Sequence, residues 1–142
     1  MATYEGRRGA RNVVVTVDGS PLPPRNDLKN HSPDGFEWGY AGSGPAQLAL
    51  ALLAHHFSLT DTRELADLKA LALYQAFKAK LIAVLPEEGW QLSGFVVADT
   101  VQLIVKAEAM AFFELAMEQR AENAALLREL GDCYTILEQN ST

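Results

Sequence analysis

The side chains that could do chemistry in this chain are three histidines, a single cysteine and a scattered set of carboxylates. His55 and His56 are neighbours, so on a helix their side chains point about 100° apart and cannot easily share one metal ion. Cys133 is alone, which excludes a zinc cluster of several cysteines. His31 and Glu37 could serve as a base and the group that orients it, but the sequence fixes no distance between them. We therefore predict no catalytic residue, no bound metal and no cofactor, and we favour a protein that is not an enzyme.

A second set of candidates lies in and before a loop, residues 34–45, in which glycines are interspersed with aromatic side chains. Together with the polar residues from Arg25 onward, this loop makes a connection of about twenty residues, and connections of that length are often functional. The candidate residues for binding a ligand or a partner are Arg25, His31, Glu37, Trp38, Tyr40, Ser43 and Gly44.

Three interpretations of this loop are open. Its aromatic rings could pin it to the core. Its backbone N–H groups, with those at the start of the following helix, could bind a phosphate or a carboxylate. It could also contact a protein partner. Pro45 lacks an N–H donor, Ser43 lacks the sequence of a nucleophile elbow, and the glycine spacing matches neither a P-loop nor a dinucleotide site. The first interpretation is therefore favoured.

A helix must follow this loop. Ser43 is the predicted N-cap, and Pro45 suits the first turn. From residue 46 to residue 53, every residue except Gln47 is alanine or leucine, and both are strong helix formers. A helix that is apolar on all sides must be buried on most of them, and this one is shorter than the ~20 residues that cross a membrane. Residues 45–56 are therefore predicted to be the central core helix.

The N-terminal part is predicted to be β-structure. Residues 12–17 are rich in valine and predict a strand. Asp18-Gly19 predicts a hairpin turn, and residues 20–22 begin a return strand whose prolines keep it at a sheet edge. Residues 3–5 predict another edge strand. Because a hairpin alone is marginal in water, this hairpin or three-stranded sheet must pack on the alanine–leucine helix.

A second helix is predicted from a cap at Asp61, with Glu64 in capping-box spacing, to residue 85. Its apolar residues recur at helical spacing and predict the buried face. They are Leu65, Leu68, Leu71, Tyr74, Phe77, Leu81 and Val84. Beyond this helix, Trp90 is predicted to lie in a short link and to fill the core.

Ser93 is predicted to cap a third helix that runs to about residue 130, with Gly131 as its C-cap. Whether residues 94–130 form one helix, or two helices separated near Lys106, stays open. The segment 118–123 is polar on nearly all sides, so a regular coiled coil is not predicted.

Taken together, these elements predict an α+β, mainly helical fold. A small N-terminal antiparallel hairpin or sheet is expected to pack on a bundle of three to four α-helices. We expect one domain over residues 1–142. It would comprise a hairpin and loop (1–33), a core with the glycine-aromatic loop and helices (34–105) and an acidic helical tail (106–142).

The net charge of −6 comes from the second part of the chain. Residues 1–45 carry five basic and five acidic residues, whereas residues 46–142 carry seven basic and thirteen acidic residues. An acidic surface argues against direct binding to nucleic acid. The single cysteine fits a reducing compartment, and no basic-then-apolar signal opens the chain. We therefore expect a cytoplasmic protein that does not bind a membrane.

Three stretches of the chain form a longer combined motif. They are Asn30-His31-Ser32-Pro33 with the run from Gly35 to Leu53, then Leu73-Tyr74-Gln75-x-Phe77-Lys78, then Trp90-x-Leu92-Ser93. This combination resembles a family of small bacterial and phage proteins of unknown function, the DUF6166 type, over roughly residues 3–105. The resemblance implies a bacterial or mobile-element origin and a cytoplasmic setting, and it implies no particular activity.

The leading hypothesis is a small, non-enzymatic protein-binding module of bacterial or mobile-element origin. It would engage a protein partner through the loop, the acidic tail or both, and it could inhibit a host defence or replication factor. The interface candidates in the tail are Glu108, Glu114, Glu118 and Glu122. Pairing of two copies through the C-terminal helix is an open alternative.

The rival hypothesis is a nucleotide- or anion-binding domain that could also be an enzyme. In this hypothesis the helix start at Ser43 and Gly44 would hold the anion, and Arg7, Arg8 or Arg25 would surround it.

Overall fold

The computed structural model describes the backbone of residues 1–140 and the side chains of residues 1–132. The chain divides into two compact units, Met1–Ile104 (unit 1) and Val105–Thr142 (unit 2). Each unit is described by itself below. The expectation of one domain over residues 1–142 stays a prediction.

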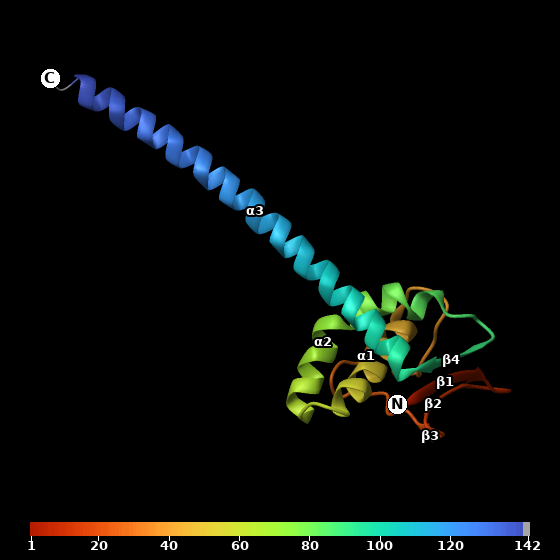
Figure 1. The fold of residues 1–142 in the computed structure, drawn as a ribbon. Coiled ribbons are helices and arrows are strands. Elements are labelled where there is room, and N and C mark those ends of the chain that lie inside the picture. The colour runs from red at the N-terminus through yellow and green to blue at the C-terminus, as the bar shows by residue number, and fades with distance from the viewer. Residues whose placement is uncertain (141–142) are drawn as a thin grey trace. The chain divides into compact units, whose positions relative to one another are not determined.

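Unit 1 contains a four-stranded antiparallel sheet. Its strands are β1 (Thr3–Arg8), β2 (Val13–Val17), β3 (Ser20–Pro21) and β4 (Gly89–Ser93), in the order β3-β2-β1-β4 (Figure 1). The predicted strand at residues 12–17 and its edge partner after it are confirmed. The turn between them is Asp18-Gly19, whose φ angles of 49° and 84° are both in the left-handed region that this type of hairpin turn requires.

Two predictions about the sheet are wrong. β1 was expected at an edge, but it is a central strand because β2 pairs on one side of it and β4 on the other. Trp90 was expected in a link, but it lies within β4, opposite Gly6 of β1. In β4 the buried Trp90 and Leu92 alternate with the exposed Gln91, so the strand carries a period-two pattern over only five residues.

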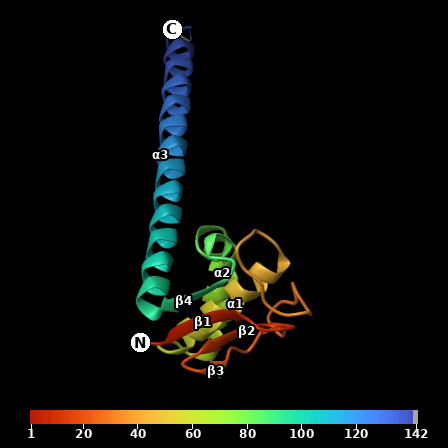
Figure 2. The same cartoon turned by 90° about the vertical axis from the view of Figure 1, so that its right-hand side faces the viewer.

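The central helix α1 (Ser43–Ser58) is confirmed as the core of the fold. Its residues from Gly44 to Ala54 are all buried. In two views α1 lies between the strands and the next helix, α2 (Figure 1, Figure 2). A helix between two layers has no face left for solvent, which explains why this segment is apolar all round. The predicted N-cap is wrong by one residue, because Gly42 is the cap and its carbonyl accepts the Ala46 N–H at 3.0 Å.

Helix α2 (Arg63–Lys80) ends five residues before its predicted end, and a short 3-10 helix, η1 (Ile82–Val84), follows. Thr62, rather than Asp61, is the N-cap, and its hydroxyl accepts the Leu65 N–H at 3.3 Å. The Asp61 carboxylate instead accepts a hydrogen bond from Lys69 Nζ at 2.9 Å. The capping-box prediction at Asp61 is therefore wrong.

The predicted buried face of the second helix is wrong at its first three leucines and at Val84, which is 70% exposed. Leu65, Leu68 and Leu71 are exposed, whereas Ala66, Ala70, Tyr74 and Phe77 are buried. Alanines one turn apart let two helix backbones approach closely, so the helix faces α1 with its small residues and leaves longer side chains outside.

Helix α3 (Gly94–Asn140) is one continuous helix, which settles the choice left open at Lys106. The Ser93 hydroxyl accepts the Val96 N–H at 3.3 Å, as the predicted cap requires. Gly131 is inside the helix, so its prediction as a C-cap is wrong. One glycine costs a helix only about 1 kcal/mol relative to alanine, and no proline follows it to stop the helix. The fold is thus α+β and mainly helical, as predicted.

Candidate functional site

The structure places Trp38 of the glycine-aromatic loop in the core, where its side chain is 1% exposed. Its indole N–H donates to the carbonyl oxygen of Glu87 at 3.1 Å, and its ring packs edge-on against Trp90 with 5.6 Å between the centroids. The next residue, Gly39, donates its N–H to the carbonyl oxygen of Ile82 at 3.1 Å. This part of the loop is thus held by residues far along the chain.

The Glu37 carboxylate is engaged by Arg8 of β1. The Arg8 guanidinium donates two parallel hydrogen bonds to it, at 2.9 and 3.1 Å, and a third at 2.6 Å to the Glu87 carbonyl. It also stacks over the Trp38 ring at 4.7 Å. The hydrogen bonds from Arg8 hold the pKa of Glu37 below its ordinary value. A carboxylate held this way is a poor general base, so Glu37 acts here as an anchor for the loop.

A pocket of about 660 Å³ lies where the β1–β2 turn faces the glycine-aromatic loop. We call it the loop pocket. It brings together four of the predicted binding residues, Glu37, Tyr40, Ser43 and Gly44, and adds Arg8, Arg11 and Asp34. Its two arginines are balanced by two carboxylates, so no strong net charge attracts an anion to it.

Gly44 allows the loop to fold closely onto the start of α1. A β-carbon at this position would lie 2.7 Å from the β-carbon of Glu37, which is closer than the two atoms can approach. The glycine next to the predicted helix start is therefore explained by close packing, and this explanation needs no bound anion.

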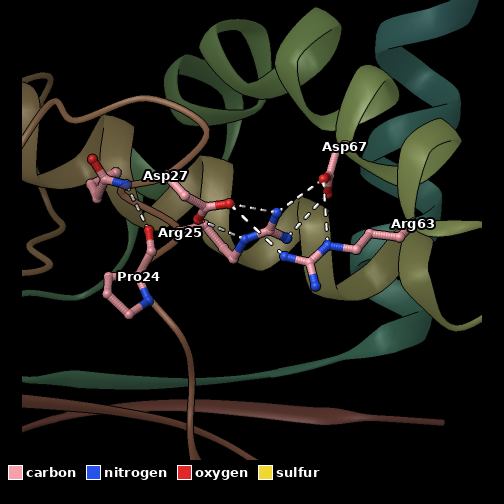
Figure 3. Close-up of polar contacts among 6 residues, drawn as sticks. Pro24, Arg25, Asp27, Arg63 and Asp67 are labelled. Carbon is pink, nitrogen blue, oxygen red and sulfur yellow. Dashed lines mark hydrogen bonds and ion pairs between the residues drawn. The ribbon is translucent and has the colours of Figure 1, made fainter.

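Arg25 lies away from the loop pocket, at a second pocket of about 410 Å³ that also contains His55, Ser58 and Arg63. The Arg25 guanidinium donates to the Asp67 carboxylate at 3.0 and 3.1 Å and to the Asp27 carboxylate at 3.0 and 3.2 Å (Figure 3). Arg63 lies 4.0 Å from both carboxylates. The structure therefore separates Arg25 from Ser43 and Gly44, which the anion-binding hypothesis grouped together.

His31 contributes to a buried polar contact between the loop and two helices. Its Nε2 atom is 2.7 Å from the Tyr74 hydroxyl, and its backbone N–H donates to the Gln47 side-chain oxygen at 2.8 Å. Gln47 also accepts the Ser32 N–H at 3.3 Å and donates to the Pro24 carbonyl at 2.6 Å. Gln47 was not among the residues predicted to form a site. The sequence does contain an indication of its role, because Gln47 is the one polar residue in the alanine–leucine run of residues 46–53. A side-chain amide buried in such a run needs hydrogen-bond partners.

His55 links α1 to the sheet, since its Nδ1 atom lies 2.8 Å from the hydroxyl of Tyr4 in β1. Burial raises the pKa of Tyr4, so this hydroxyl stays protonated at neutral pH. Burial also lowers the pKa values of His31, His55 and His56. The three histidines are therefore neutral parts of the packed structure at neutral pH.

Because the pKa values of these three histidines are lowered, we expect the protein to lose stability on mild acidification. Because burial depresses their pKa values in the folded chain, the unfolded chain binds more protons once the pH falls through its histidine pKa of about 6.5. The free energy of unfolding should therefore decrease between about pH 7.5 and pH 5.5, above the range in which carboxylates titrate. Urea unfolding across this range measures the loss, and NMR titration of the ring protons measures the three pKa values. Ring pKa values at or above 6.5 would contradict the prediction.

Among the residues that the structure describes, no three side chains of histidine, cysteine, aspartate or glutamate are grouped as metal ligands would be. Within the same part of the chain, no helix is long and apolar enough to cross a membrane.

The comparison with protein families decides the family of this chain. The model of a family of unknown function, DUF6166, matches residues 4–103, which is well over half of the 142 residues. The chain belongs to the DUF6166 family. No curated protein and no solved structure matches it. The DUF6166 match includes the sheet, α1, α2 and both pockets.

Beyond the DUF6166 match, the predicted interface residues Glu108, Glu114, Glu118 and Glu122 are exposed on α3 in unit 2. Glu114, Glu118 and Glu122 follow one another at intervals of four and form an acidic stripe. The same stretch exposes several large apolar side chains. They are Met110, Phe112, Phe113, Leu115, Met117, Leu126, Leu127 and Leu130. This stretch carries the most extensive exposed apolar surface found on a single described element.

Proposed function

We propose that this DUF6166 protein is a small, non-enzymatic protein-binding module and that α3 in unit 2 is its binding element. The observation that carries the proposal is the exposed apolar side chains of residues 105–130, among them Phe112, which is 74% exposed. Single exposed apolar residues are ordinary, but a contiguous set marks an interaction surface.

The length of this helix adds support. Most of the stability of a helix in a protein comes from packing an apolar face, and isolated helices are marginal in water. Burying apolar surface contributes roughly 25 cal/mol per Å², so covering several phenylalanine and leucine side chains would stabilise both the helix and a complex. A protein partner with an apolar face is therefore the expected ligand.

The setting and biological role belong to the same proposal. A chain with a single cysteine suits the cytoplasm, where thiols stay reduced. In a bacterium or a mobile element, the partner would be a host factor that the protein inhibits. The acidic stripe would speed association with a basic surface on that factor, since charge complementarity acts mainly on the association rate.

Site-specific photocrosslinking in the producing cells tests the binding element. A photoreactive phenylalanine analogue is placed at Phe112 in one variant of the full chain and at Ala121 in another. Both positions are exposed, but helical geometry puts residue 121 on the opposite face from residue 112. We expect protein adducts from position 112 and few from position 121. Absence of adducts from both positions would contradict the proposed function.

A separate variant tests the role of the acidic stripe. Glu114→Lys with Glu118→Lys reverses two exposed charges and leaves the apolar side chains in place. If a basic host factor is the partner, its association rate should fall and should lose its dependence on salt. An unchanged association rate would remove the inhibitor part of the proposal.

The loop pocket supports a second candidate function, binding of a nucleotide or another anion, with or without catalysis. Its volume of about 660 Å³ and its position beside Ser43 and Gly44 are the favouring observations. Arg8 is engaged by Glu37, so Arg11 is the cation to test. ATP and inorganic phosphate should bind the full chain and lose affinity with Arg11→Ala. If neither shifts any NMR resonance of the pocket, this candidate is wrong.

A further inference from the structure

We propose that the partner of α3 is a second copy of this chain, and that residues 105–130 of the two copies pair as a parallel, two-stranded coiled coil. This inference rests on the proposed function, because it names the protein that binds the apolar face of α3. The spacing of the apolar residues on α3, their exposure and the signs of the flanking charges support this pairing.

A coiled coil needs core positions that alternate at intervals of four and three along one continuous helix. Residues at this spacing, which we call the seam, are Val105, Ala109, Phe112, Ala116, Gln119, Asn123, Leu126 and Leu130. Six of the eight are apolar. From sequence alone the polar segment 118–123 argued against a coiled coil, but only Gln119 and Asn123 of that segment are on the seam.

The continuity of α3 is what makes the seam a single surface. A break near Lys106 or in the polar segment would change the rotation of the apolar residues before and after it. Because α3 is one helix, Phe112 and Leu126 lie on the same face two heptads apart. The larger apolar seam residues are exposed, with values of 48% at Val105 and 57% at Leu126. The seam is therefore available to a partner.

The two polar seam residues select a second copy over an unrelated helix. In each copy the Gln119 side-chain N–H₂ donates to the Asn123 side-chain oxygen at 3.3 Å. In a parallel pair without offset, every layer joins identical residues, so Asn123 faces Asn123 and each apolar residue faces an apolar one. An unrelated helix would need its own polar residues at the same two levels. A buried asparagine at this type of position is known to set the register and the number of strands.

The flanking charges select the parallel direction. Glu108, Glu122 and Glu129 come directly before the seam residues Ala109, Asn123 and Leu130. Lys106 and Arg120 come directly after the seam residues Val105 and Gln119. An antiparallel pair brings each of these sets against itself, so glutamates would meet glutamates. A parallel pair brings the first set against the second, where Glu122 meets Leu127 of the other copy. No like charges then meet across the seam.

The acidic stripe is compatible with this pairing. Glu114 and Glu118 lie on the side of the helix away from Phe112 and Leu126, by helical geometry. Pairing therefore buries apolar side chains without removing these carboxylates from water, which would be costly. Two copies joined in this way leave Glu114 and Glu118 of both chains free for another protein.

Light scattering with size-exclusion chromatography tests the pairing on the full chain. We expect a mass about twice the 15.5 kDa of one chain at micromolar concentration. Leu126→Glu places a charge on the seam and should weaken the dimer by at least tenfold. Met117→Glu makes a comparable change at an exposed apolar residue off the seam and should leave the dimer intact. Fluorescence of Trp38 and Trp90 reports that unit 1 of each variant is folded, and far-UV circular dichroism reports that its helix content is unchanged.

Disulfide cross-linking tests the direction. In a Cys133→Ser background, Leu130→Cys should oxidise rapidly to a linked dimer if the helices are parallel without offset. Arg128→Cys, which is off the seam, should not. A second measurement tests Asn123 directly, since Asn123→Leu should increase affinity and allow species larger than dimers.

The oligomeric state and the crosslinked products together test the coiled-coil dimer. A monomer at all concentrations, a trimer or tetramer of the unaltered chain, or equal effects of Leu126→Glu and Met117→Glu would overturn it. A monomer whose position 112 crosslinks to another protein would overturn only this inference and support the proposed function. A monomer that gives no protein adduct at all would overturn both.

Discussion

Gly6→Ala is expected to destabilise unit 1 by about 2–3 kcal/mol, as overpacking of a closed core does. A β-carbon at Gly6 would overlap the Cε2 and Nε1 atoms of the Trp90 indole. The Trp90 indole covers Gly6 because the two residues are directly paired across β1 and β4. β1 is a central strand, so it cannot move outward to relieve the contact without disturbing both of its neighbours.

The Trp90 ring cannot move away freely, because it is packed edge-on against Trp38 at 5.6 Å. Trp38 is in turn held by Arg8 and by the carbonyl of Glu87. Displacing the ring would therefore also disturb the Arg8–Glu37 pair that shapes the loop pocket. Urea unfolding followed by tryptophan fluorescence measures the loss of stability.

Gly131→Ala is the matched control for this substitution. It is the same chemical change, at an exposed position inside α3 where a new β-carbon would meet no atom within 4 Å other than the backbone of its own helix and its chain neighbours. Alanine should favour the helix by about 1 kcal/mol. An unfolding midpoint for Gly6→Ala equal to that of the unaltered chain would show that the Trp90 ring is not fixed over Gly6.

Gln47→Met is expected to lower the free energy of unfolding by about 2–4 kcal/mol, because it removes the partners of three backbone groups. Gln47 is fully buried and joins α1 to the Pro24 carbonyl and to the N–H groups of His31 and Ser32. Methionine has a similar length and shape, so the packing is largely kept while the hydrogen bonds are lost. The cost is the burial of groups that water no longer solvates.

Hydrogen exchange distinguishes this cause from a general loss of packing. In Gln47→Met the amides of His31 and Ser32 should exchange faster than other protected amides of unit 1. Gln75→Met serves as the control, since Gln75 is an exposed residue in the middle of α2. It should change stability by less than about 0.5 kcal/mol. If both variants unfold alike, Gln47 does not hold the loop to α1.

Local features of the chain were predictable from the sequence. The alanine–leucine run determined α1, Asp18-Gly19 determined the β2–β3 turn, and Ser93 determined the start of α3. Each of these depends on side chains and backbone groups within a few residues, so a short stretch contains all the information. The combined motif also identified the DUF6166 family, which fixed no activity.

The grouping of the candidate site residues could be decided only by the tertiary structure. β4 makes β1 a central strand from more than eighty residues away, and it carries Trp90 onto Gly6. The same packing brings the Glu37 carboxylate into an ion pair with Arg8. It also places Arg25 at a different pocket from Ser43 and Gly44. Which face of α2 is buried followed from the fit against α1, where Ala66 and Ala70 allow a closer approach than leucines would. These outcomes depend on contacts between distant segments, and the sequence spacing of single elements carries no information about such contacts.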